Sequence, residues 1–141
     1  MTVARTTRLA LAWLALSALQ IGAWALLAPQ SFYDNFPGFG RSWVSVDGPF
    51  NEHLVRDVGA LNLALAVLLV AAAIRLSRDL VSVAAIASLV WGVPHALYHL
   101  ANTDGLSTMD NLASIGGLLF SVVLAAMLLV SAKKLDTASA A

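Results

Sequence analysis

The chain has 141 residues, of which 60% are hydrophobic and 11% are charged, and its formal net charge is zero. About a quarter of the residues in soluble proteins are charged, so this composition excludes an ordinary soluble domain and indicates a membrane protein. Because cysteine is absent, the chain can form neither disulfides nor thiolate metal sites. The balanced charge gives no reason to expect a nucleic-acid partner.

Four apolar segments predict four membrane-spanning helices, at about residues 9–28, 52–74, 80–101 and 108–132. Each is close to the ~20 residues that cross a hydrocarbon core. Backbone groups find no water there, so such segments can only be helices. We therefore expect one all-α domain over residues 1–141, an integral membrane four-helix bundle and a multi-pass protein of the bacterial cytoplasmic membrane.

Lysine and arginine fall mainly in the N-terminus, the connection between the second and third helices, and the C-terminus: Arg5, Arg8, Arg75, Arg78, Lys133 and Lys134. The positive-inside rule makes that side cytoplasmic. The opposite side carries several acids, with Arg41 as its only loop cation. Both termini are therefore expected in the cytoplasm.

Residues 30–51, between the first two helices, are rich in aromatic side chains, namely Phe32, Tyr33, Phe36, Trp43 and Phe50. Aromatic rings favour the headgroup level of a bilayer, and the stretch Pro37-Gly38-Phe39-Gly40 predicts a turn. We interpret residues 30–51 as an interfacial aromatic lid, here called the lid, over the outer ends of the helices. An aromatic belt without a gating role is the alternative.

Local signals place the helix starts and the close helix contacts. Asn51 is a candidate N-cap, and Ser107 with Asp110 has the spacing of a capping box. Small residues recur every four positions, which allows close backbone approach, in two helices: Ala84, Ser88 and Gly92 in the third, and Ala113, Gly117, Ser121 and Ala125 in the fourth.

Ionisable residues gather at the outer ends of the second and third helices, where an unpaired charge is expensive. The short connection near Ser77 makes these helices antiparallel, which predicts two layers. The upper layer would hold His53, His99 and Asp110, and the lower layer Arg56, Asp57 and His95. Two further residues join these layers: Glu52, which is the i,i+4 partner of Arg56, and Tyr98 on the third helix. The candidate ligand-binding pocket is therefore Glu52, His53, Arg56, Asp57, His95, Tyr98, His99 and Asp110.

Several chemistries suit such a set. His53, His95 and His99 could bind a divalent metal with a carboxylate from Asp57 or Asp110. Haem between His53 and His99 is less favoured, because acidic neighbours would crowd the propionates. Acid–base chemistry on a lipid-soluble substrate such as a quinone would use a histidine oriented by Asp57.

The alternative is structural: Glu52–Arg56 and Asp57–His95 would satisfy one another and fix the bundle without a ligand. Proton or ion passage is disfavoured, because the inner halves of helices two to four offer only small hydroxyls and Asn62. No catalytic residue is assigned, and whether the protein is an enzyme stays open.

The segments at residues 52–59 (EHLVRDVG) and 94–99 (PHALYH), with the long first outer loop and its Pro-Gly-Phe-Gly, resemble the small DoxX-like membrane proteins of bacteria, in an actinobacterial branch. Some DoxX relatives are similar to membrane subunits of oxidoreductase systems that act on sulfur compounds or quinones. The resemblance thus implies a membrane oxidoreductase-type subunit, and it supplies no site residues.

The expected function is an outward-facing His/Asp/Arg pocket that binds a small ligand or metal. Its expected partners are the lipid bilayer and a lipid-soluble small molecule or quinone, with a homo-oligomer or a partner membrane subunit as further candidates. A structural or accessory membrane subunit, whose polar cluster only fixes helix packing, is the alternative function.

Overall fold

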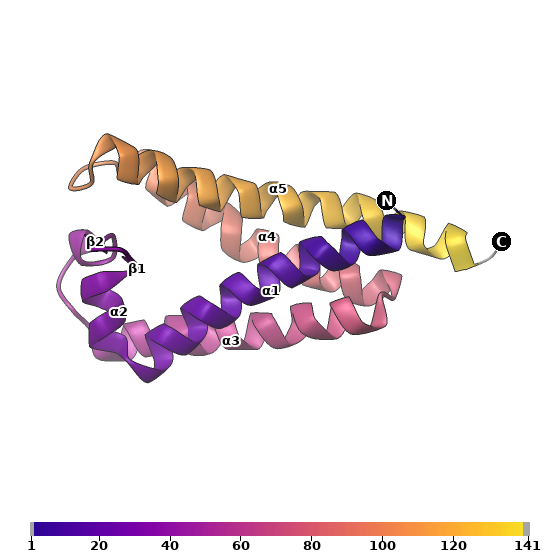
Figure 1. The fold of residues 1–141 in the computed structure, drawn as a ribbon, viewed down its shortest axis with the longest axis horizontal. Coiled ribbons are helices and arrows are strands. Elements are labelled where there is room, and N and C mark those ends of the chain that lie inside the picture. Colours follow the sequence, from indigo (N-terminus) through magenta and orange to yellow (C-terminus); the bar gives the residue numbers. More distant parts are fainter. Residues whose placement is uncertain (1, 140–141) are drawn as a thin grey trace.

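The computed structural model describes residues 2–139, with side chains described as far as Leu135. These residues form five α-helices, a short hairpin and one 3-10 turn (Figure 1). The helices are α1 Val3–Leu27, α2 Pro29–Asn35, α3 Glu52–Arg75, α4 Arg78–Ala101 and α5 Thr108–Ser139. Strands β1 (Pro37–Gly38) and β2 (Arg41–Ser42) pair antiparallel, and the 3-10 turn η1 is Ser45–Asp47.

Four of these helices are long and apolar enough to cross a membrane: α1, α3, α4 and the Thr108–Leu135 part of α5. The prediction of a helical membrane protein with four candidate spans is therefore confirmed, and its apolar helices fit a lipid bilayer. Two boundaries differ, because α1 begins at Val3 rather than near residue 9 and α5 continues past residue 132. Apolar runs mark the part of a helix that suits hydrocarbon, whereas its hydrogen bonds continue into polar sequence.

The helix starts follow the local sequence signals. Asn51 Oδ1 accepts a hydrogen bond from the Leu54 backbone N–H at 3.1 Å, which caps α3. Ser107 Oγ accepts from the Asp110 backbone N–H at 3.1 Å and donates to Asp110 Oδ2 at 2.6 Å. The expected cap on α3 and the expected capping interaction between Ser107 and Asp110 are both confirmed.

The helices pack as two pairs rather than as a uniform bundle. α1 packs mainly against α3, and α4 mainly against α5. Figure 1 shows that the pairs meet at the end where both chain termini lie, here called the terminal end, and diverge toward the other end. We call that other end the lid end, because α2, the hairpin and η1 lie there.

The main apolar core joins all four long helices in the terminal half. Its largest fully buried side chains are Leu11, Leu69, Val81 and Leu128, which come one from each long helix. Alanines fill the spaces between them, so the helices approach closely there. A second, smaller apolar cluster lies at the lid end and holds Ala25, Phe32 and Val55 from α1, α2 and α3.

The backbones of α1 and α3 come into close contact where the two helices cross. A Cβ added to Gly59 would lie 2.5 Å from the backbone nitrogen of Leu26 and 2.9 Å from the carbonyl oxygen of Gly22. Only glycine fits such a distance, so Gly22 and Gly59 let the two backbones touch. This contact holds the beginning of α3 against the end of α1, away from α4.

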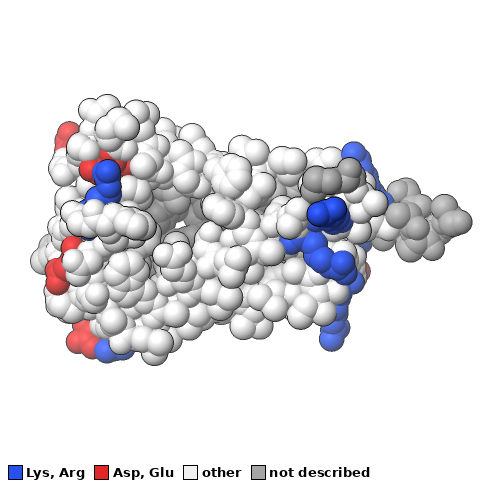
Figure 2. All heavy atoms as spheres, in the orientation of Figure 1, with Lys and Arg blue, Asp and Glu red and all other residues white. Residues whose placement is uncertain are grey.

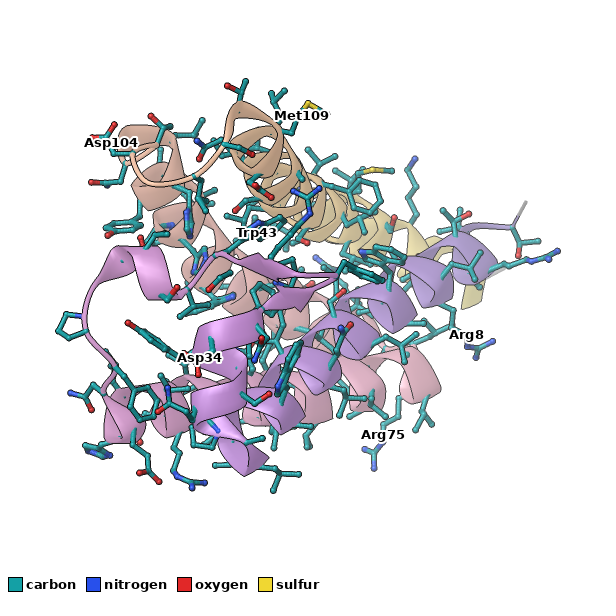
Figure 3. All side chains as sticks on the ribbon, turned by 60° about the vertical axis from the view of Figure 1, so that its left-hand side comes forward. Arg8, Asp34, Trp43, Arg75, Asp104 and Met109 are labelled. Carbon is teal, nitrogen blue, oxygen red and sulfur yellow. The ribbon has the colours of Figure 1, made fainter. Side chains whose placement is uncertain are left out.

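Charge is segregated along the bundle. On the face drawn in Figure 2, lysine and arginine gather at the terminal end, acids gather at the lid end together with some basic residues, and the middle is uncharged. Arg8 and Arg75 mark the terminal end, whereas Asp34, Trp43 and Asp104 mark the lid end (Figure 3). An uncharged band between two charged ends is the pattern expected of membrane-embedded helices.

The lid has regular structure. Its Pro-Gly-Phe-Gly stretch forms the expected turn between β1 and β2, where Phe39 and Gly40 take left-handed backbone angles with φ of 59° and 73°. The phenol of Tyr33 donates to the Gly48 carbonyl at 2.6 Å, which folds the segment back on α2. Phe39, at the hairpin tip, is 99% exposed, as an interfacial anchor would be.

Candidate functional site

Three aromatic side chains lie in a row along α4 at the lid end: Trp91, His95 and His99, here called the ring stack. The four-residue spacing places all three on one side of the helix. The ring centroids of Trp91 and His95 are 4.8 Å apart, and those of His95 and His99 are 5.0 Å apart. Tyr98 meets the edge of His99 at 5.5 Å.

The two imidazoles of the ring stack are half-buried and contact neighbouring rings. The Asp47 carboxylate of η1 interacts electrostatically with His95. Within residues 2–139, no hydrogen bond or ion pair joins either imidazole to another protein group. A neutral imidazole has one donor and one acceptor nitrogen, and a polar group at membrane depth needs a partner. His95 lies six residues before the end of α4, which is about 9 Å along the helix axis.

A second polar group ties the lid to α5. Its members, here called the lid anchor, are Arg41, Trp43, Ser107 and Asp110. The Asp110 carboxylate accepts hydrogen bonds from the Arg41 guanidinium, from Trp43 Nε1 at 2.8 Å and from Ser107 Oγ at 2.6 Å. Figure 3 shows Trp43 on the hairpin side of the gap to α5.

Neither Arg41 nor Trp43 was expected in the site. The sequence did carry a signal for Arg41, which is the only loop cation among the acids at that end. A cation among several acids can pair with one of them, but its position in the chain does not say which.

A third polar group lies at the beginning of α3. Arg56 Nε donates to Glu52 Oε1 at 2.9 Å, which confirms the expected i,i+4 contact. The same guanidinium also donates to the carbonyl of Leu26, near the end of α1. Arginine is favourable at a helix C-terminus, where carbonyls lack intrahelical partners. Arg56 therefore fastens α3 to α1.

His53 and Asp57 lie outside these three groups. Their side chains approach each other, with His53 Nε2 3.5 Å from Asp57 Oδ2, and they are 87% and 55% exposed. Their only ionic contact among the described residues is with each other.

The two-layer arrangement expected from the sequence therefore does not form. Asp110 meets the lid instead of His53 and His99, and Asp57 pairs with His53 instead of His95. The cause is the pairing of the helices, because α3 leans on α1 at the lid end while α4 stays with α5. A short connection fixes two helices side by side only near that connection.

The metal and haem hypotheses need ligands from both α3 and α4. In the described part of the chain no three His, Cys, Asp or Glu side chains come close enough to hold a metal ion together. His95 and His99 offer two imidazoles, and His53 does not join them. The geometry gives no support to a metal held jointly by the three histidines.

Comparison of the chain with protein-family models, curated proteins and solved structures gave no match. The resemblance to DoxX-like proteins therefore stays a prediction. The side chains of the site itself are the guide to what the protein binds.

Proposed function

We propose that the protein is a multi-pass component of the bacterial cytoplasmic membrane that binds a small lipid-soluble molecule at the ring stack, beneath the lid. The termini face the cytoplasm, and the site opens toward the outer leaflet. The bound molecule carries a carbonyl or hydroxyl group and an apolar body, as a quinone does.

The distribution of charge supports the orientation. All six cations of the two termini and the α3–α4 connection belong to the terminal end, and Figure 2 shows basic residues gathered there. Positive residues stay on the cytoplasmic side during insertion. The acids and the aromatic lid then face outward.

The observation that carries the ligand proposal is the pair of half-buried imidazoles without hydrogen bonds to the protein. No buried side-chain nitrogen or oxygen among the described residues lacks a partner, so the ring nitrogens that make no hydrogen bond reach the surface, where a molecule from outside the chain can bond them. A neutral imidazole can donate to a carbonyl oxygen or accept from a hydroxyl. Trp91, at the deeper end of the stack, adds an aromatic face for an apolar ring.

Acid–base chemistry on the bound molecule would follow from the same pair. Histidine gains and loses a proton near neutral pH, so His95 or His99 could exchange a proton with a bound hydroxyl group. Electron transfer would need a redox partner, which is the partner membrane subunit expected from the DoxX resemblance.

A structural role is the second candidate, and a different observation favours it. Glu52, Arg56 and Asp110 all have protein partners, and these contacts join α1 to α3 and the lid to α5. These residues therefore hold the helices and the lid together, and we call them the fasteners. In an accessory subunit all polar side chains of the lid end, including those of the ring stack, would only hold the helices and the lid together.

Equilibrium binding of a decyl-substituted benzoquinone to the detergent-purified protein separates the two candidates. His95→Leu and His99→Leu each remove one hydrogen-bonding group and should weaken binding about tenfold. His53→Leu is the matched control, because His53 is exposed and lies outside the ring stack, and it should bind like the wild type. Equal affinity in all four proteins, or no saturable binding, would leave the structural role.

A further inference from the structure

The lid packs against both helix pairs at the lid end. On one side Val44 packs against the smaller apolar cluster of α1, α2 and α3. On the other side Trp43 Nε1 donates to the Asp110 carboxylate of α5 at 2.8 Å. Val46 of η1 lies against the connection between α4 and α5, because a Cβ added to Gly105 would be 3.2 Å from the Val46 Cβ. The segment around η1 is therefore held beside the end of α4 that carries the ring stack.

Asp47 brings a negative charge to the ring stack. It directly follows Val46, and its carboxylate interacts electrostatically with His95. The side chain is exposed and makes no hydrogen bond or ion pair within the described residues. Arg41, the cation of the lid, does not neutralise it, because the Arg41 guanidinium belongs to the lid anchor. The other ionisable group that acts on His95 is His99, so Asp47 is the acid that acts on this imidazole.

A negative charge beside a neutral imidazole changes which hydrogen bond the ring makes best. The ring has one donor and one acceptor nitrogen. The carboxylate attracts positive charge, so it strengthens the imidazole as an acceptor and weakens it as a donor. A ligand hydroxyl, which donates, should then bind better than a ligand carbonyl, which only accepts.

We infer that Asp47 makes the ring stack selective for molecules that donate a hydrogen bond to His95, so that a benzoquinol binds in preference to the corresponding benzoquinone. Such selectivity rests on the proposed function, because it concerns the molecule bound at the ring stack. Asp47 acts through His95 and not by touching the ligand, so it determines specificity and is not a catalytic residue.

Equilibrium binding of a decyl-substituted benzoquinol and of its benzoquinone to the detergent-purified protein, measured without oxygen, tests this selectivity. The quantity compared is the ratio of the two dissociation constants, because a structural defect would weaken both ligands alike. The wild type should bind the quinol more tightly. Asp47→Asn keeps the size of the side chain and removes its charge, and it should lower the preference about fivefold.

Two control variants show whether the charge at this position is responsible. Asp47→Glu keeps the charge and should keep the preference. Asp104→Asn removes another exposed acid of the lid end (Figure 3) and should leave the preference unchanged, because Asp104 is not among the groups that act on His95. Equal losses in Asp47→Asn and Asp104→Asn would mean that the general negative potential of the lid end sets the preference, which would overturn the inference.

Double variants test whether Asp47 acts through His95. In a His95→Leu background Asp47→Asn should no longer change the ratio, whereas in a His99→Leu background it should still lower it. An effect of Asp47→Asn that persisted without His95 would contradict the inferred route.

The same measurements separate the selectivity from the ligand site itself. If both ligands bound saturably and Asp47→Asn left their ratio unchanged, the selectivity would be wrong and the proposed ligand site would stand. If neither ligand bound saturably, both would be wrong.

Discussion

The lid end contains two kinds of polar group, and the difference between them separates structure from function. Around Arg56 and around Asp110, every charged group has a protein partner, and Arg56, Arg41 and Asp110 each reach another part of the chain. In the ring stack, His95 and His99 have ring neighbours but no hydrogen-bonding protein partner among the described residues. Polar groups that have protein partners stabilise the fold, whereas polar groups without a protein partner are available to bind a ligand.

Substitutions can test this contrast, because fasteners should affect stability and the ring stack should not. The backbone contact that sets the helix pairing should matter most, the contacts of Asp110 and Arg56 less, and the two histidines least.

Gly59→Val should have the largest effect on stability. The new Cβ would lie 2.5 Å from the Leu26 backbone nitrogen, and a backbone atom cannot rotate away. We expect a loss of about 3 kcal/mol in the free energy of unfolding, measured by denaturant unfolding in detergent micelles. Gly116→Ala is the control, since a Cβ there meets nothing within 4 Å; a similar loss in both variants would mean that Gly59 does not set the crossing.

Trp43→Phe should loosen the lid. It keeps an aromatic ring next to Phe36 but removes the Nε1 hydrogen bond to the Asp110 carboxylate. Hydrogen exchange of the lid amides should become faster, with little change in the long helices. Trp24→Phe loses a bond to the neutral hydroxyl of Ser31, worth about 1 kcal/mol, and should have the smaller effect because bonds to charged acceptors are stronger.

Arg56→Gln should weaken the contact between α1 and α3 by about 1 kcal/mol, because it removes both the ion pair and the bond to the Leu26 carbonyl. Glu52→Gln keeps the carbonyl bond and removes only the ion pair, which is worth about 0.5 kcal/mol at this exposed position. Thermal unfolding of both variants measures the difference. Should the two lose the same amount, the carbonyl bond would contribute nothing.

His95→Leu and His99→Leu should have the smallest effect on stability, within about 0.5 kcal/mol of the wild type. Neither side chain gives up a hydrogen bond to the protein, and leucine suits a membrane helix. Unfolding in detergent without added ligand is the measurement. A loss as large as that of Arg56→Gln would place the ring stack among the fasteners.

The sequence predicts the features that depend on local pattern. Hydropathy locates the four spans, and the spacing of Ser107 and Asp110 predicts their cap on α5. The small residues Ala84, Ser88 and Gly92 are buried, as their four-residue repeat predicts. Each of these signals lies within one helix or at one helix end, where spacing and geometry are directly linked.

Features that depend on which surfaces meet are not visible in the sequence. The repeat in α5 predicted a close contact at Gly117, but that glycine is exposed and a Cβ there would meet nothing within 4 Å. A close backbone contact instead uses Gly22 and Gly59, of which Gly22 follows the small residue Ala18 by four positions. Small residues permit close approach without choosing the partner, so the expected meeting of His53 with His99 depended on a pairing that the sequence does not encode locally.

Native mass spectrometry of the protein in lipid nanodiscs, extracted directly from the membrane of the producing bacterium, tests the central claim most directly. The wild type and His53→Leu should both retain a small molecule other than phospholipid, and the double variant His95→Leu with His99→Leu should lack it. If the double variant retained the same molecule, or if the wild type carried nothing beyond phospholipid, the ring stack would not be a ligand site.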